Sequence, residues 1–137
     1  MRTALLRARL LLLGLGLLTL SGAAGSARAD VSVALTPATQ FVTPGTDFDV
    51  FVDVTSAGSA FNGFDLVVSF DPTVITPLPA APTTLQQGCL MTGGCSAACG
   101  NTFHLFSTAG DSVVVSDVLL CNQVSLTGPG RIYHLRF

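Results

Sequence analysis

Apolar and polar residues alternate with a period of two along most of the chain after residue 29. The clearest case is the segment 47–54, in which Phe48 and three valines fall on one side while Phe51 and three aspartates fall on the other. A period of two is typical of a β-strand with one buried and one solvated face. No segment after residue 29 has the period of an amphipathic helix, so the pattern predicts an all-β fold.

Seven segments combine this alternation with boundaries rich in Gly, Pro, Ser and Asp. Several short strands separated by turn residues indicate a sandwich or a barrel. The predicted strands span residues 31–35, 40–43, 47–55, 61–70, 102–107, 112–120 and 131–137.

The predicted strand 61–70 runs directly into an Asp71-Pro72 turn. Alternation assigns its residues to two opposite faces. One face carries Phe64, Leu66, Val68 and Phe70 and is expected to join the core, while the other carries Asp65, Val67 and Ser69 and is expected to face outward.

Between residues 73 and 99 the alternation fails and Pro and Gly dominate. A loop of this length in a compact domain is usually functional or held by cross-links. Four cysteines, Cys89, Cys95, Cys99 and Cys121, lie in or after it. We interpret the segment as a disulfide-pinned crossover between two sheets, and the order of the pairs stays open because four cysteines allow three pairings.

The first 29 residues have the features of a secretory signal peptide. Arginines come first, an apolar run follows at residues 10–18, and Ala27-Arg28-Ala29 ends the segment, so cleavage is expected before Asp30. The apolar run is too short for a comfortable membrane span, and no second one follows. The remaining 108 residues (137 − 29) are enough for one domain of a secreted protein, either free or attached to the cell surface by other means.

The part after residue 29 is strongly acidic. It contains eight Asp, two Arg, no Lys and no Glu, which gives a formal charge of −6 (2 − 8). Nucleic-acid binding needs clustered Lys or Arg, so nucleic acid is excluded as an expected partner. The segment RIYHLRF at residues 131–137 ends within an apolar pattern, which suggests a sequence incomplete at its C-terminus, because natural sheets protect their strand edges.

Metal and catalytic sites are weakly supported. Zinc on Cys95, Cys99 and His104 is the alternative to disulfides, but secreted cysteines usually oxidise. Calcium on the Asp47, Asp49 and Asp53 stripe is disfavoured because alternate strand residues lie about 7 Å apart, so we expect a solvated acidic face. No Gly-x-Ser-x-Gly motif and no Glu are present. We therefore expect no enzyme activity, no cofactor and no metal.

Four segments follow one another in a characteristic order: VSVALTPATQFVTPGTDFDVFVDV (31–54), FNGFDLVVSFDPTVI (61–75), SVVVSDVLL (112–120) and GRIYHLRF (130–137). Their most specific parts are the Pro44-Gly45-x-x-Phe48 strand entry, the block from Gly63-Phe64-Asp65 to Phe70-Asp71-Pro72, and the final Gly-x-x-x-x-Leu-x-Phe strand. In this order and at this spacing, the segments resemble the cohesin family of bacterial secreted modules.

This resemblance implies a nine-stranded jelly-roll β-sandwich over residues 30–137, with about seven of the nine strands present and two C-terminal strands missing. Cohesins are related to cellulose-binding modules and bind dockerin modules in extracellular polysaccharide-degrading complexes, and similar domains occur in cell-surface proteins. A polar pair in the family helps to grip dockerin; its Asp matches Asp65, and the position of its Asn matches Gly63.

Three functions follow as hypotheses. The first is dockerin-type protein recognition through Asp65, Val67 and Ser69. The second is carbohydrate binding linked to polysaccharide catabolism, with Phe51 and Tyr133 as the aromatic candidates. This alternative is disfavoured because the chain has no Trp and a single Tyr. The third is a purely structural surface domain.

Overall fold

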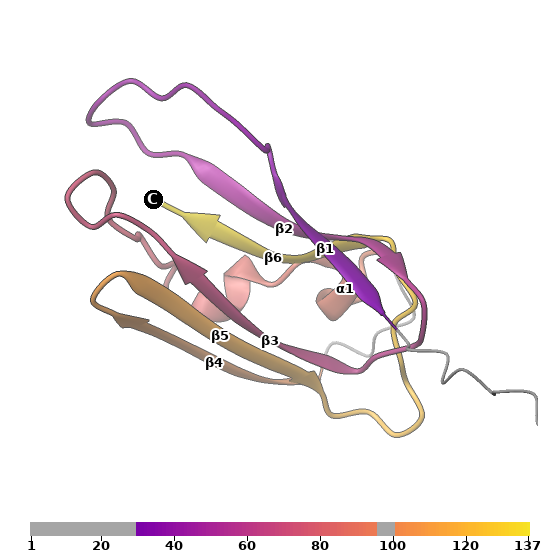
Figure 1. Cartoon of the computed structure of the whole chain (residues 1–137). Coiled ribbons are helices and arrows are strands. Elements are labelled where there is room, and N and C mark those ends of the chain that lie inside the picture. Colours follow the sequence, from indigo (N-terminus) through magenta and orange to yellow (C-terminus); the bar gives the residue numbers. More distant parts are fainter. Residues whose placement is uncertain (1–29, 96–100) are drawn as a thin grey trace, which may run out of the picture.

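The computed structural model describes residues 30–95 and 101–137, and its regular structure is mostly β, as the alternation predicted (Figure 1). The expected signal peptide, residues 1–29, and Cys99 lie outside the described residues. The strands are β1 (Val31–Thr36), β2 (Asp49–Ala57), β3 (Gly63–Ser69), β4 (Thr102–Ala109), β5 (Ser112–Leu119) and β6 (Gly130–Arg136). A 3-10 helix, η1 (Thr83–Gln86), and a one-turn helix, α1 (Cys89–Thr92), lie between β3 and β4.

The six strands form two antiparallel three-stranded sheets with the orders β1-β2-β6 and β3-β5-β4. Figure 1 shows them as two layers, with η1 and α1 close to β6. The register between β4 and β5 runs without interruption from Thr102 opposite Leu119 to Ala109 opposite Ser112. A two-residue turn at Gly110 and Asp111 joins these strands, and its glycine has the positive φ of 60° that such hairpin turns favour.

The core lies between the two sheets and takes side chains from both. Val52 and Val54 of β2, together with Leu135 of β6, are buried against Val113 and Val115 of β5 in one cluster. Fully burying a side chain of this size contributes about 1.5 to 3 kcal/mol. The alternation had assigned two sets of residues to the core, and both pack there: Phe48, Val50, Val52 and Val54; Phe64, Leu66, Val68 and Phe70.

One predicted strand is wrong. Residues 40–43 form no strand, and Phe41 within them is fully exposed. Pro37 and Pro44 flank this segment, and proline cannot donate a hydrogen bond to a neighbouring strand. A short apolar run therefore looked like a strand although no neighbouring strand pairs with it.

The long loop before β4 covers one edge of β6. Three carbonyl oxygens of β6 accept hydrogen bonds from this loop, each at 2.8 Å: Arg136 from the N–H of Leu78, His134 from the side-chain amide of Gln86, and Ile132 from the N–H of Gly88. Gly88 approaches so closely that a Cβ there would lie 2.3 Å from the carbonyl oxygen of Arg131. The expected exposed edge at the final strand is therefore covered on this side, because loop backbone and the Gln86 amide replace a neighbouring strand.

Candidate functional site

The outward-facing surface of the β3-β5-β4 sheet carries exposed apolar side chains from all three strands. Val67 of β3 is 64% exposed, and Phe103 and Leu105 of β4 are 56% and 51% exposed. We call this surface the apolar outer face. Its members are Val67, Val114, Val118, Phe103 and Leu105, with Asp65, Ser69, Ser107 and Ser116 between and beside them.

Strand register arranges these side chains in rows across the sheet. The central row places Asp65 of β3 and Leu105 of β4 on either side of Ser116. The rows beside it are Gly63, Val118 and Phe103 on one side and Val67, Val114 and Ser107 on the other. Directly opposed residues in such a row have Cβ atoms about 5 Å apart, so the members form one continuous surface.

Asp65 is the acidic residue of this surface. Its Oδ1 atom accepts a hydrogen bond from the hydroxyl of Ser116 at 2.5 Å. Within residues 30–95 and 101–137 no cation forms an ion pair with it. The prediction that Asp65, Val67 and Ser69 face outward is confirmed, since all three are exposed. A carboxylate held by one hydroxyl amid apolar side chains can accept further hydrogen bonds from a partner.

Gly63, the first residue of β3, lies at the end of this surface and packs tightly against β5. A Cβ at this position would lie 2.8 Å from the carbonyl oxygen of Asp117 and 2.9 Å from a methyl carbon of Val118. The resemblance matched Gly63 to an Asn in cohesins. The backbone of this chain has no room for that side chain without a shift of β3 relative to β5.

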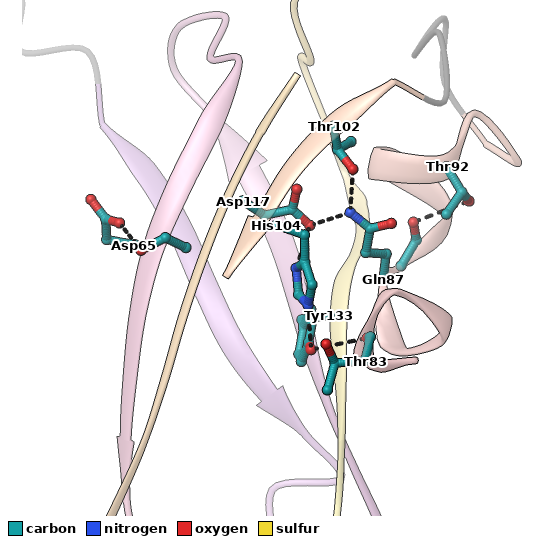
Figure 2. A network of polar contacts seen from close by, with 10 residues as sticks. Asp65, Thr83, Gln87, Thr92, Thr102, His104, Asp117 and Tyr133 are labelled. Carbon is teal, nitrogen blue, oxygen red and sulfur yellow. Dashed lines mark hydrogen bonds and ion pairs between the residues drawn. The ribbon is translucent and has the colours of Figure 1, made fainter. Parts of the chain in front are cut away.

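On the inward side of the same sheet, behind the apolar outer face, β4 and β5 bury polar groups (Figure 2). The side chain of His104 on β4 is 4% exposed and that of Asp117 on β5 is 0% exposed, with His104 Nδ1 and Asp117 Oδ2 3.5 Å apart. The side-chain amide of Gln87 donates to Asp117 Oδ2 at 2.6 Å and to the hydroxyl of Thr102 at 2.7 Å. The Tyr133 ring stacks on the His104 ring with centroids 5.6 Å apart.

The hydrogen bonds of Tyr133 indicate where a proton lies in this network. Its hydroxyl donates to the carbonyl of Thr83 at 3.3 Å, so its oxygen is left to accept from Nε2 of His104 at 3.4 Å. His104 Nδ1 then faces Asp117 Oδ2, which already accepts from the Gln87 amide. Among the described residues, His104 Nδ1 and Asp117 Oδ1 have no hydrogen-bond partner.

Burial dominates the acid–base properties of this network. Burial raises the pKa of Asp117, and hydrogen bonding from Gln87 and the nearby His104 oppose the increase. Burial also raises the pKa of Tyr133 far above its usual range, with the charge of Asp117 as a second cause. Neither His104 nor Asp117 is accessible to a substrate, so the network is best explained as a support that ties β4, β5, β6 and the loop together.

The other sheet presents a different surface, which we call the charged outer face. Asp47 accepts from Arg136 at 2.9 Å, Asp49 lies 2.8 Å from Nε2 of His134, and Asp53 accepts from Arg131 at 3.0 Å. The expected acidic stripe therefore lies on the outer side of the sheet, with Asp53 partly buried, and each of its carboxylates contacts a side chain of β6. No cluster of metal-ligating side chains occurs in the part of the chain that the structure describes.

The two aromatic candidates for carbohydrate binding occupy different places. Tyr133 is fully buried, so its assignment to a sugar-stacking surface is wrong. Tyr133 lies opposite Val52 of β2 and shares its side of β6 with Leu135, so its ring is turned into the core. Phe51 is half-buried on the charged outer face, beside an open hollow of about 740 Å³, and the Arg131 guanidinium lies 3.5 Å from its ring centroid.

The three cysteines that the structure describes are oxidised, as expected. Cys89 and Cys95 form a disulfide that closes the segment around α1, and Cys121 is also disulfide-bonded. Cys95 is therefore not a zinc ligand. The disulfide lies directly after Gln87 and so restrains the segment that donates to Asp117.

Sequence reasoning did not identify Phe103, Leu105 and Val118 as surface residues. Alternation showed that Phe103 and His104 must point to opposite sides of β4 but not which one points inward.

Comparison with protein-family models, with curated proteins and with solved structures finds no match for this chain. Among the described residues, no helix is long and apolar enough to cross a membrane.

Proposed function

We propose that this protein is a secreted, non-catalytic, cohesin-like recognition module that docks a dockerin-type protein partner on its apolar outer face. The module acts in an extracellular polysaccharide-degrading or cell-surface assembly, and its two sheets form the described part of a jelly-roll β-sandwich. The observation that carries the proposal is the row arrangement that places Asp65 on one surface with Val67, Val118, Phe103 and Leu105.

Three properties of this surface support protein recognition. Exposed apolar side chains gather on it, which is typical of interaction sites on soluble proteins. It is built on a hydrogen-bonded sheet, so little conformational entropy is lost on binding. Asp65, on edge strand β3, places one charged acceptor in the middle row of this surface, and a hydrogen bond to a charged group is stronger than one between neutral groups.

The carbohydrate alternative has less support from the same contacts. A sugar ring stacks on an open aromatic face, and the guanidinium of Arg131 already lies over the ring of Phe51. Tyr133 cannot contribute because it is buried. A sugar could stack on Phe51 only if the Arg131 side chain moved away. Protein recognition on the apolar outer face requires no such movement.

Binding to an immobilised, purified dockerin module tests the proposal. We expect Asp65→Ala and Leu105→Ala each to weaken binding at least about tenfold, because both residues lie in the central row. Asp47→Ala is the matched control, since it removes an exposed carboxylate from the other sheet and should leave affinity unchanged. Unchanged affinity in both central-row variants would exclude this face, and absence of binding by the unaltered chain would exclude a dockerin-type partner.

A further inference from the structure

Four strands lie at the edges of the two sheets, and three of them have a feature that opposes pairing with another chain. β1 has a register shift between Ser32 and Val33 and is followed by Pro37. The loop before β4 covers β6. β3 carries the charge of Asp65 near its middle, so pairing of two β3 strands would bring two carboxylates together. Natural edge strands use these same devices, which are bulges, proline, charge and covering segments.

β4 has none of these devices. Its sequence, TFHLFSTA, contains no Pro, Asp, Glu, Lys or Arg, and it pairs with β5 over all eight residues without a register shift. No described segment pairs with its other edge. An edge strand without bulge or charge, and with half-exposed Phe103 and Leu105, is a template for a further strand.

The hydrogen-bond pattern shows which backbone groups are available. The N–H of Leu120 donates to the carbonyl of Asn101, so residue 101 belongs to the set that bonds across to β5. Along an antiparallel strand these sets alternate. The N–H and C=O groups of residues 102, 104, 106 and 108 therefore point to the free edge.

We propose that the free edge of β4 pairs with β4 of a second copy of this chain in an antiparallel, two-fold symmetric arrangement. With Leu105 opposite its own copy, the even-numbered residues supply the hydrogen bonds and Phe103 lies opposite Ser107. Residues with the same parity face the same side, so both apolar outer faces join into one surface across a six-stranded sheet.

Charge favours β4 over β3 for this pairing. All eight Asp and both Arg after residue 29 lie outside β4, so no like charges meet across the two-fold axis. His104 is turned inward against Asp117 and Tyr133 and keeps its imidazole away from the second copy. An eight-residue edge buries little area, so the dimer belongs to the weak, reversible class of interfaces.

Sedimentation equilibrium of the secreted chain tests this pairing. We expect reversible dimerisation between about 1 µM and about 1 mM, the range in which weak interfaces dissociate. Thr108→Pro removes one N–H from the free edge without altering the apolar outer face, and should weaken dimerisation at least about tenfold, while Thr108→Ala should not. A chain that remains monomeric throughout this range would overturn the proposal.

A second pair of variants separates the edge from the face. Leu105→Lys places two like charges opposite each other on the two-fold axis and should abolish the dimer. Val67→Lys adds the same charge to the same face, two strands away from the edge, and should leave dimerisation intact. Loss of the dimer in Val67→Lys but not in Thr108→Pro would show that the copies associate through their faces, which contradicts edge pairing. Urea unfolding of each variant confirms that it is folded.

Discussion

The two outer faces of this molecule treat charge in opposite ways. On the charged outer face two carboxylates form ion pairs with arginines of β6, and a third contacts His134. On the apolar outer face Asp65 has the Ser116 hydroxyl as its hydrogen-bond partner, and Leu105 lies on the far side of Ser116 in the same row. A partner that covers the apolar face has few charges to desolvate, whereas covering the other face would disturb two ion pairs and the contact of His134.

The inward-facing sides of the two sheets differ in the opposite sense: the sheet with the apolar outer face is the one that buries charged and polar groups. The β1-β2-β6 sheet buries mainly apolar side chains, such as Val52 and Leu135. The β3-β5-β4 sheet buries Asp117 and His104 directly behind Phe103 and Leu105. The difference indicates that β4 is oriented by its inward polar contacts, at the expense of apolar burial on its outer side.

The largest expected effect comes from breaking the buried pair. His104→Leu leaves the carboxylate of Asp117 without its imidazole partner, and we expect the free energy of unfolding to fall by about 3 kcal/mol. Urea unfolding measures this change. A loss below about 1 kcal/mol would mean that the pair behaves like an exposed one, and would remove the contrast between the two sheets.

A smaller effect concerns pH. Because burial raises the pKa of Asp117, the folded protein binds this proton more readily than the unfolded chain does. This contribution to stability is fully present below the ordinary carboxyl pKa of 3.8 and is lost as pH rises through the folded-state value.

Asp117→Asn should therefore gain stability relative to the unaltered protein as pH rises from about 4 to about 7, while keeping an acceptor for the Gln87 amide. Urea unfolding of both proteins across this range measures the difference, in which the other carboxyl groups cancel. A difference that shrinks as pH rises would contradict the assigned direction of the pKa.

The smallest effect is expected on the charged outer face. Arg136→Ala removes the exposed pair with Asp47 and should change the free energy of unfolding by less than about 1 kcal/mol. High salt should make the effect of the substitution smaller still, because salt screens an exposed ion pair. The same urea measurement at low and high salt tests this. A loss as large as that of His104→Leu would show that the two faces do not differ in the way described.

Much of the fold was predictable from local alternation. The strands near residues 31, 47, 61, 102, 112 and 131 were located within a few positions, and the core sides of β2 and β3 were assigned correctly. The segment 40–43 was assigned wrongly because alternation alone does not show whether a partner strand exists. The contribution of Gln86 was also invisible, since its amide acts as a substitute for backbone on β6, 48 residues away.

The candidate site was predictable in part. Asp65, Val67 and Ser69 were placed on an outer surface from their period of two, and they lie there. The contribution of Phe103 and Leu105 was missed, because hydropathy favours burying Phe103 rather than His104. Tyr133 was misjudged because alternation within residues 131–137 does not show by itself which side faces the core, and the pairing with Val52 of β2 turns Tyr133 inward.

The sequence alone therefore determined where the strands run and which residues within β2 and β3 share a side, because a backbone period of two is a local property. Tertiary structure decided which strands are neighbours, and so placed Asp65 beside Ser116 from 51 residues away. It also decided that His104 points inward, through its contacts with Asp117 and Tyr133. These outcomes depend on long-range packing and on partners for buried polar groups, which no local pattern encodes.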